Sequence, residues 1–289
     1  MSKFLHFLLV VLMAVCTSNV SAQQFTDPGF EDWSGAKFAD AEQPKYWNFS
    51  NVSQMGIDKN FAHKTTGRSG SALKIQDQWV GAMGIGATSP GYVALGKPWA
   101  YVSSITAIDD ATAGTYGGIQ WKYRPDSMVV WIKRYYDNGA DGADGDHVME
   151  EDFNILYYAW SGTSQGTSYK AKDGSCTNIY KSKPEYCIDE ESDIRQALNG
   201  NECETKTYAK QIAEGWICDR KVYSNWTRIV IPIYYLNDDV PQKCNVILSA
   251  GRYPDFRANE GQYAGSTMDV DDISLVYSSK IQKLYINGR

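Results

Sequence analysis

Histidine and carboxylate side chains are the first candidates for catalysis, because they exchange protons near neutral pH. Of the 3 histidines, His6 lies in an apolar N-terminal segment, so only His63 and His147 could serve in a mature protein. Neither lies in a GxSxG or HExxH motif, and a Ser–His–Asp triad would have to be assumed. A glycosidase needs two carboxylates at a defined separation, and spacing selects no pair among the 34 acidic residues. The sequence therefore predicts no catalytic residues.

Aromatic side chains are the second candidates, because the C–H faces of sugars stack on aromatic planes. The chain contains 20 Tyr and 9 Trp, which is more than a core of this size readily hides. We therefore expect some of these rings to face a ligand or a partner. The predicted ligand-binding residues are Trp79, Trp99, Tyr158 and Trp160.

Strand alternation and loop position support this choice. In the segment FNILYYAW the residues predicted to face inward are Ile155, Tyr157 and Ala159. Leu156, Tyr158 and Trp160 then share the opposite face of the strand. Trp79 and Trp99 flank a glycine-rich stretch in which loops are expected to present them. The alternative is that all these rings only cover a second hydrophobic layer.

Period-two alternation recurs along the chain and predicts an all-β fold. The residues alternating in the two longest closing runs are Ile229, Ile231, Ile233, Ile273, Leu275 and Tyr277. Pro232 lacks an N–H group, so its strand is predicted to lie at a sheet edge or beside a bulge. No helical pattern separates these runs, which favours antiparallel sheets. At the other end, FTDPGFEDW (25–33) is predicted to form a first strand that enters the core.

The first 22 residues have the pattern of a secretory signal, with a lysine, an apolar run and small residues before Gln23. We expect an exported protein in the periplasm, at the cell surface or secreted. The predicted organisation is one domain at 23–277 with a tail at 278–289. The formal charge of −6 becomes −7 without Lys3, and no basic cluster is present, so nucleic acid is not an expected partner. No further apolar segment predicts a membrane span.

Five of the 6 cysteines lie beyond the signal, which predicts disulfides in an oxidising compartment. Four of them fall in a polar segment, 163–222, that is predicted to be a stapled insertion. Short loop closure favours the pairs Cys176–Cys187 and Cys203–Cys218, with Cys244 left buried in its strand. The acidic stretch 137–152 is predicted to be a solvated loop that joins two strands of a hairpin or meander, because its spacing does not match a calcium-binding loop.

The two ends of the chain resemble the bracketing motifs of jelly-roll carbohydrate-binding modules. The motifs are GFEDW at 29–33 and DVDDISLVY at 269–277. The resemblance implies that the first and last strands lie together and hold a structural calcium ion, with Glu31 and Asp271 as ligands. The alternative is that Asp269 and Asp272 simply cap a strand.

A second resemblance covers nearly the whole mature chain. The blocks GRSGSALKI, GIQWKYRPD, FNILYYAW, NWTRIVIPIYYL and NVILSAGRYPDF resemble the family named "putative carbohydrate metabolism domain", found in exported proteins of Bacteroidetes. The resemblance implies a jelly-roll β-sandwich and a role in glycan handling, without catalytic residues to transfer. The cysteine-rich insertion departs from the family pattern.

These features together predict an exported carbohydrate-binding protein that recognises an oligo- or polysaccharide through exposed aromatic rings. Other glycan-utilisation proteins of the cell envelope are the further partners expected. Two alternatives stay open: a glycoside hydrolase with a carboxylate pair, and a structural or adhesive component of the cell envelope.

Overall fold

The computed structural model describes residues 22–54, 56–101, 112–145, 147–162, 210–251, 253 and 263–278. Every regular element in these ranges is a β-strand, and every strand pair is antiparallel. The prediction of an antiparallel all-β fold is confirmed, whereas the jelly-roll assignment stays a prediction. The described part contains no helix with the length and apolarity that a membrane crossing needs. The predicted signal at 1–22 lies almost wholly outside the described residues.

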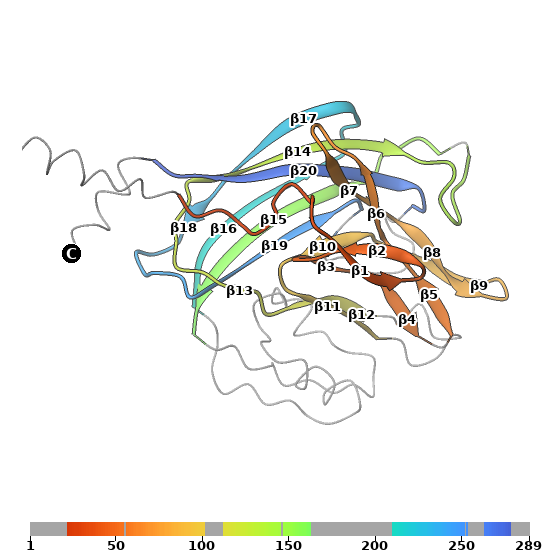
Figure 1. Cartoon of the computed structure of the whole chain (residues 1–289), viewed down its shortest axis with the longest axis horizontal. Coiled ribbons are helices and arrows are strands. Elements are labelled where there is room, and N and C mark those ends of the chain that lie inside the picture. Colours follow the sequence, from red (N-terminus) through yellow and green to blue (C-terminus); the bar gives the residue numbers. More distant parts are fainter. Residues whose placement is uncertain are drawn as a thin grey trace, which may run out of the picture.

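Two sheets form the layers of a sandwich (Figure 1). The five-stranded sheet has the order β17-β14-β20-β7-β6. Its strands are β6 (Ala62–Thr66), β7 (Ser71–Gln76), β14 (Ser127–Tyr136), β17 (Tyr223–Pro232) and β20 (Ser266–Val276). The seven-stranded sheet has the order β18-β16-β15-β19-β10-β3, and β13 also pairs with β19. Its strands are β3 (Asn48–Phe49), β10 (Tyr92–Ala94), β13 (Ile119–Gln120), β15 (Phe153–Ser161), β16 (Lys210–Asp219), β18 (Tyr234–Tyr235) and β19 (Lys243–Ser249).

Four two-stranded units accompany the sandwich. They are β1 (Trp33–Phe38) with β2 (Ala41–Pro44), β4 (Val52–Gln54) with β5 (Ile57–Lys59), β8 (Gln78–Ala82) with β9 (Ile85–Ser89), and β11 (Lys97–Tyr101) with β12 (Thr112–Tyr116). Figure 1 shows β18 at the left of the sandwich and these four units to the right of it.

Alternating side chains of both sheets fill the space between the layers. Ile229, Ile231 and Ile233 are at most 8% exposed, whereas Val230 between them is 43% exposed. This difference confirms the predicted alternation. β17, which ends at Pro232, is an edge strand, as the missing N–H group predicts. Ile273 and Leu275 of β20 are buried in the same core.

Two expectations about connections are wrong. The strands on either side of 137–152 do not pair, because β14 belongs to the five-stranded sheet and β15 to the seven-stranded sheet. The long connection allows the chain to cross between layers, so it is not a hairpin loop. The segment 25–32 is not a strand, although Phe25 and Phe30 are buried in the core as expected. Its Pro28 carbonyl accepts a hydrogen bond from Ile273 N of β20 at 2.9 Å.

The predicted insertion at 163–222 is too long at its C-terminal end, since 210–219 form β16 in the middle of a sheet. No disulfide joins residues within the described part of the chain. Cys218 lies exposed on β16, and its predicted partner Cys203 lies outside the described residues, as do Cys176 and Cys187. The prediction for Cys244 is confirmed: it is fully buried in β19, and burial raises the pKa of its thiol well above the ordinary value.

The crossing from β14 to β15 is fixed by a buried guanidinium. Arg134 points into the core and has no exposed surface. Its Nη2 donates to the Glu151 carbonyl at 2.6 Å, and its Nη1 donates to the Arg220 carbonyl at 2.9 Å. The Glu151 carboxylate accepts a hydrogen bond from Ser266 Oγ and lies 2.9 Å from His147 Nε2. Burial raises the pKa of Glu151, but these hydrogen bonds outweigh burial and the net shift of its pKa is downward.

Asp77 lies in the same buried network. Its Oδ1 accepts a hydrogen bond from Gly91 N at 2.8 Å, and the residue has no exposed surface. Burial and the nearby Glu151 raise the pKa of Asp77 well above its ordinary value, against the opposing effect of Arg134 and backbone amides. The folded state therefore keeps the proton at pH values where the unfolded chain has lost it.

This shift predicts the sign of a pH effect. Because the folded pKa of Asp77 is raised, its contribution to the free energy of unfolding falls as pH rises above the unfolded value of about 3.9. Asp77→Asn mimics the protonated form, so we expect the difference in unfolding free energy, variant minus wild type, to grow from pH 4 to pH 8 in urea titrations.

Asp137→Asn is the control of opposite sign, because a hydrogen bond from Lys74 lowers the pKa of Asp137. That variant should lose stability above the unfolded pKa and recover it as pH falls. If Asp77→Asn lowers the unfolding free energy equally at every pH, or lowers it more as pH rises, the result contradicts a protonated Asp77.

Candidate functional site

The side chains of β15 point alternately into the core and to the outer face of the seven-stranded sheet. The residues pointing into the core, each without exposed surface, are Ile155, Tyr157 and Ala159, as the alternation predicts. Leu156 and Tyr158 therefore lie on the outer face of the seven-stranded sheet. They are opposite Trp216 and Glu214 of β16, and Glu214 is in turn opposite Tyr234 of β18.

One half of this outer face is covered. A buried cluster lies there, made of Tyr92, Ala94, Leu156, Tyr158, Ile247 and Tyr253. The β11–β12 hairpin contacts the cluster, because Tyr92 OH donates to the Gly114 carbonyl at 2.9 Å and Thr115 Oγ1 lies 3.1 Å from Tyr253 OH. Tyr158 is 6% and Trp160 is 1% exposed. Neither ring faces solvent: Tyr158 belongs to this second hydrophobic layer, the alternative given by the sequence, and Trp160 packs against Gly118.

The other half of the outer face carries two exposed rings. Trp216 is 59% exposed and Tyr234 is 63% exposed. Because Tyr234 is opposite Glu214, Trp216 is its diagonal neighbour on the same face, at a spacing of about 7–8 Å that aromatic side chains can bridge. Glu214 lies between them, and its Oε2 accepts a hydrogen bond from Gln211 Nε2 at 2.7 Å. We call Trp216, Tyr234 and Glu214 the edge patch.

The edge patch lies on the sheet face that the sequence predicted for Tyr158 and Trp160, but on β16 and β18 instead of β15. Trp216 was missed because residues up to 222 were assigned to an insertion. The information was present in the sequence, since Glu214 and Trp216 alternate with Ala213 and Ile217 as in a strand with one buried face.

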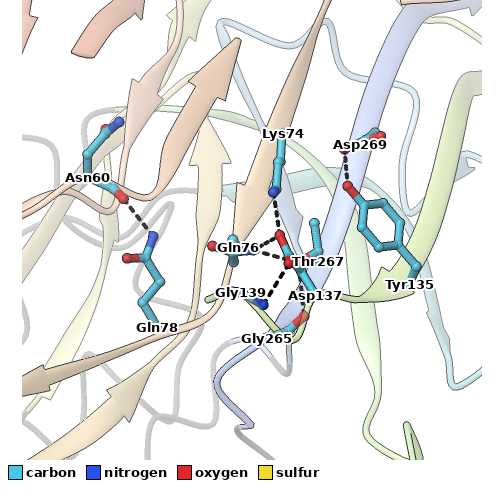
Figure 2. Close-up of polar contacts among 10 residues, drawn as sticks. All are labelled: Asn60, Lys74, Gln76, Gln78, Tyr135, Asp137, Gly139, Gly265, Thr267 and Asp269. Atoms are coloured by element: carbon cyan, nitrogen blue, oxygen red, sulfur yellow. Dashed lines mark hydrogen bonds and ion pairs between the residues drawn. The ribbon is translucent and has the colours of Figure 1, made fainter. Parts of the chain in front are cut away.

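The outer face of the five-stranded sheet carries charged side chains, and Arg68 and Lys133 lie over the rings of Trp131 and Trp226 there. One row across four strands pairs Lys133, Asp269, Lys74 and His63 directly opposite one another. Figure 2 shows that Asp137, at the end of β14, joins this row: its Oδ2 accepts hydrogen bonds from Lys74 Nζ at 2.6 Å and from Gln76 Nε2 at 2.9 Å. The row is therefore a network in which the charges pair with each other.

Asp137 and Asp269 are the two carboxylates of this network, and both adjoin Lys74. The hydrogen bond from Lys74 lowers the pKa of Asp137, whereas burial raises the pKa of Asp269. Opposite shifts are typical of acid–base pairs. Both carboxylates are nevertheless engaged, since Gly139 N donates to Asp137 Oδ1 at 2.9 Å and Tyr135 OH donates to Asp269 Oδ1 at 3.2 Å. Asp269 is only 4% exposed.

The predicted metal ligands Glu31 and Asp271 do meet at one place, the turn between β6 and β7. Glu31 Oε2 accepts a hydrogen bond from Ser71 N at 2.9 Å, and Asp271 Oδ2 accepts one from Arg68 N at 2.7 Å. The Asp272 carboxylate pairs with the Arg68 guanidinium. Burial, first, and the charges of Asp272 and Glu31 raise the pKa of Asp271.

In the structure these carboxylates contact backbone amides and Arg68. Backbone amides already occupy Asp271, because its Oδ1 accepts from Asp272 N at 2.8 Å, and N–H groups repel a cation. Among the described residues no group of three or more His, Cys, Asp or Glu could hold a metal ion. A calcium ion at Glu31 and Asp271 stays a prediction, and the contacts favour carboxylates that cap the turn and the strand.

Trp79 and Trp99 do not join the edge patch. The Trp79 ring packs within its own hairpin, where a Cβ on Gly86 would lie 2.4 Å from the ring. The backbone of Trp99 lies in β11 opposite Gly114, and its side chain is outside the described part of the structure. The prediction that Trp79 and Trp99 contact a ligand therefore stays a prediction.

A cleft of about 910 Å³ lies at the edge of the sandwich, within the roughly 300–1,000 Å³ of small-molecule sites. Its walls are the N-terminal segment 23–26, the segment 119–123, Gly162 and the segment 241–243. Phe25 and Trp121 form its aromatic floor, with ring centres 5.2 Å apart. Tyr123 packs edge-on against Trp121 and is half-buried. We call this the end cleft.

Comparison with known proteins supports the fold. No protein-family profile and no curated protein matches the sequence. A Bacteroides thetaiotaomicron structure described as a "putative glycoside hydrolase" matches with a TM-score of 0.51 and 15% identity, over 89% of this chain and 72% of that chain. A Bacteroides vulgatus structure with the same description matches with a TM-score of 0.50 and 18% identity, over 86% and 97%. The chain is thus similar in fold to proteins of Bacteroides, and membership of the carbohydrate metabolism family stays a prediction.

The capped turn predicts the response to calcium. An ion at 100 times its dissociation constant would stabilise the fold by about 2.7 kcal/mol, which corresponds to roughly 5–10 °C in melting temperature. Because amides occupy Asp271, we expect the same melting temperature in millimolar calcium and in EDTA. We also expect Asp271→Asn to melt lower in both solutions. A calcium-dependent rise that disappears in Asp271→Asn contradicts the capped turn and establishes the metal site.

Proposed function

We propose that the chain is an exported carbohydrate-binding protein that holds an oligo- or polysaccharide on the edge patch. The exposure of Trp216 and Tyr234 as neighbours on one face is the observation that carries the proposal, because contiguous exposed apolar surface marks ligand or partner sites. Sugar rings bury their C–H faces on such side chains, and the Glu214 carboxylate between the rings can accept hydrogen bonds from hydroxyl groups.

The shape of the patch supports an extended glycan. Trp216 and Tyr234 lie on neighbouring strands, and β18 pairs only with 213–214 of β16, so the strand edge beyond Glu214 is not covered by β18. A chain of sugars could cross both rings in succession. The similar structures from Bacteroides are described as "putative" glycoside hydrolases, which supports a role connected with carbohydrates.

Hydrolysis is the second candidate, because Asp137 and Asp269 both adjoin Lys74 and their pKa values are shifted in opposite directions. Binding is favoured because both carboxylates are engaged by neighbouring groups and Asp269 is buried. A purely structural role in the cell envelope differs from both, since it requires no affinity for a free oligosaccharide.

Truncation of the rings tests the proposal. With a glycan selected on an array, we expect Trp216→Ala and Tyr234→Ala each to weaken binding by about 1 kcal/mol or more in titration calorimetry. Their unfolding free energies should change by only about 0.5 kcal/mol, because both side chains are exposed.

Trp226→Ala is the matched control, since it removes a partly exposed tryptophan from the outward side of β17 in the other sheet. If both edge-patch variants keep their affinity and Trp226→Ala loses affinity, the site lies on the outer face of the five-stranded sheet. If the wild type cleaves the glycan and Asp269→Asn does not, the function is hydrolysis instead of binding.

A further inference from the structure

We propose that the end cleft is a second carbohydrate site, selective for sugars that bear a carboxylate. It lies outside the edge patch, and its existence does not depend on glycan binding there. The proposal rests on a preformed cavity, on its aromatic floor and on the charge of its lining.

The walls of the end cleft are held in place by hydrogen bonds to both sheets. Trp121 N donates to the Gln242 carbonyl at 2.8 Å, and Gln242 N donates to the Trp160 carbonyl at 2.9 Å. The N-terminal wall is tied to β20, because Gln24 Nε2 donates to the Leu275 carbonyl at 2.9 Å and Leu275 N donates back to Gln24 Oε1 at 2.6 Å. A cavity fixed in this way needs little rearrangement to accept a ligand.

The lining combines the groups that sugars require. Phe25 and Trp121 are buried at 4% and 5% exposure and form a floor, whereas the half-buried Tyr123 offers a ring for stacking. Glutamine amides both donate and accept hydrogen bonds, which suits hydroxyl groups. Besides Gln24, whose amide is engaged by Leu275, the glutamines of the lining are Gln23, Gln120 and Gln242.

The charge of the lining selects the sugar. Lys122 and Lys243 line the cleft, and none of the lining residues in the described part of the chain is acidic, although the chain carries 34 acidic against 28 basic residues. Lys122 Nζ lies 5.8 Å from the centre of the Tyr123 ring. Because this ammonium group lies over the Tyr123 ring, a carboxylate on a sugar held beside Tyr123 would be within its reach, so uronic acids fit better than neutral sugars.

Titration with trigalacturonate and with its neutral methyl ester tests this site in the full chain. We expect the acid to bind at least about fivefold more tightly than the ester, and this preference to shrink between 0.05 M and 0.5 M salt. Lys122→Met should remove the preference, and Tyr123→Ala should weaken both ligands. The control Lys221→Met removes an exposed lysine that lies 5.3 Å from the ring of Tyr223, outside the cleft, and should leave binding unchanged.

The outcomes separate the two sites. Trp216→Ala leaves trigalacturonate binding intact if the end cleft holds it, whether or not the edge patch binds a glycan. Equal binding of acid and ester, no binding of the acid at concentrations up to about 5 mM, or a preference that survives in Lys122→Met overturns the proposal. Because Lys122 is exposed, its substitution tests the charge without disturbing the core.

Discussion

The pairing of β16 with β15 on one side and with β18 on the other is the constraint on which the proposed site depends. In an antiparallel sheet, residues directly opposite share a face, so the Leu156–Trp216 and Glu214–Tyr234 pairs fix which rings point outward. A slip of one residue would turn Trp216 into the core and Ile217 out of it. The buried row on β15, centred on Tyr157, opposes such a slip because it belongs to the core.

The two outer faces of the sandwich differ in the side chains that they expose. On the five-stranded sheet, opposite charges such as Lys74 and Asp137 pair with one another, and Arg68 and Lys133 lie over the rings of Trp131 and Trp226. On the seven-stranded sheet, the β11–β12 hairpin contacts one half and leaves Trp216 and Tyr234 on the other. Aromatic surface that the fold does not cover itself is the surface on which a glycan gains most.

Local alternation predicted the direction of side chains well. It correctly placed Ile155, Tyr157 and Ala159 inside, and it placed the strand of Pro232 at an edge, because both properties follow from the geometry of a single strand. It could not predict that Trp160 is buried, since that depends on what covers the outer face. It also could not show that 137–152 crosses between sheets, because pairing partners far apart in sequence decide this.

The most direct measurement of the central claim is a titration of the ¹⁵N-labelled protein with a bound oligosaccharide, followed through the indole Nε1–H signals. The Trp216 signal is assigned by its loss in Trp216→Phe. If the edge patch holds the glycan, the Trp216 signal shifts with saturation, whereas the signals of Trp131 and Trp226 on the other sheet stay unchanged. Binding that saturates while the Trp216 signal does not move contradicts the account.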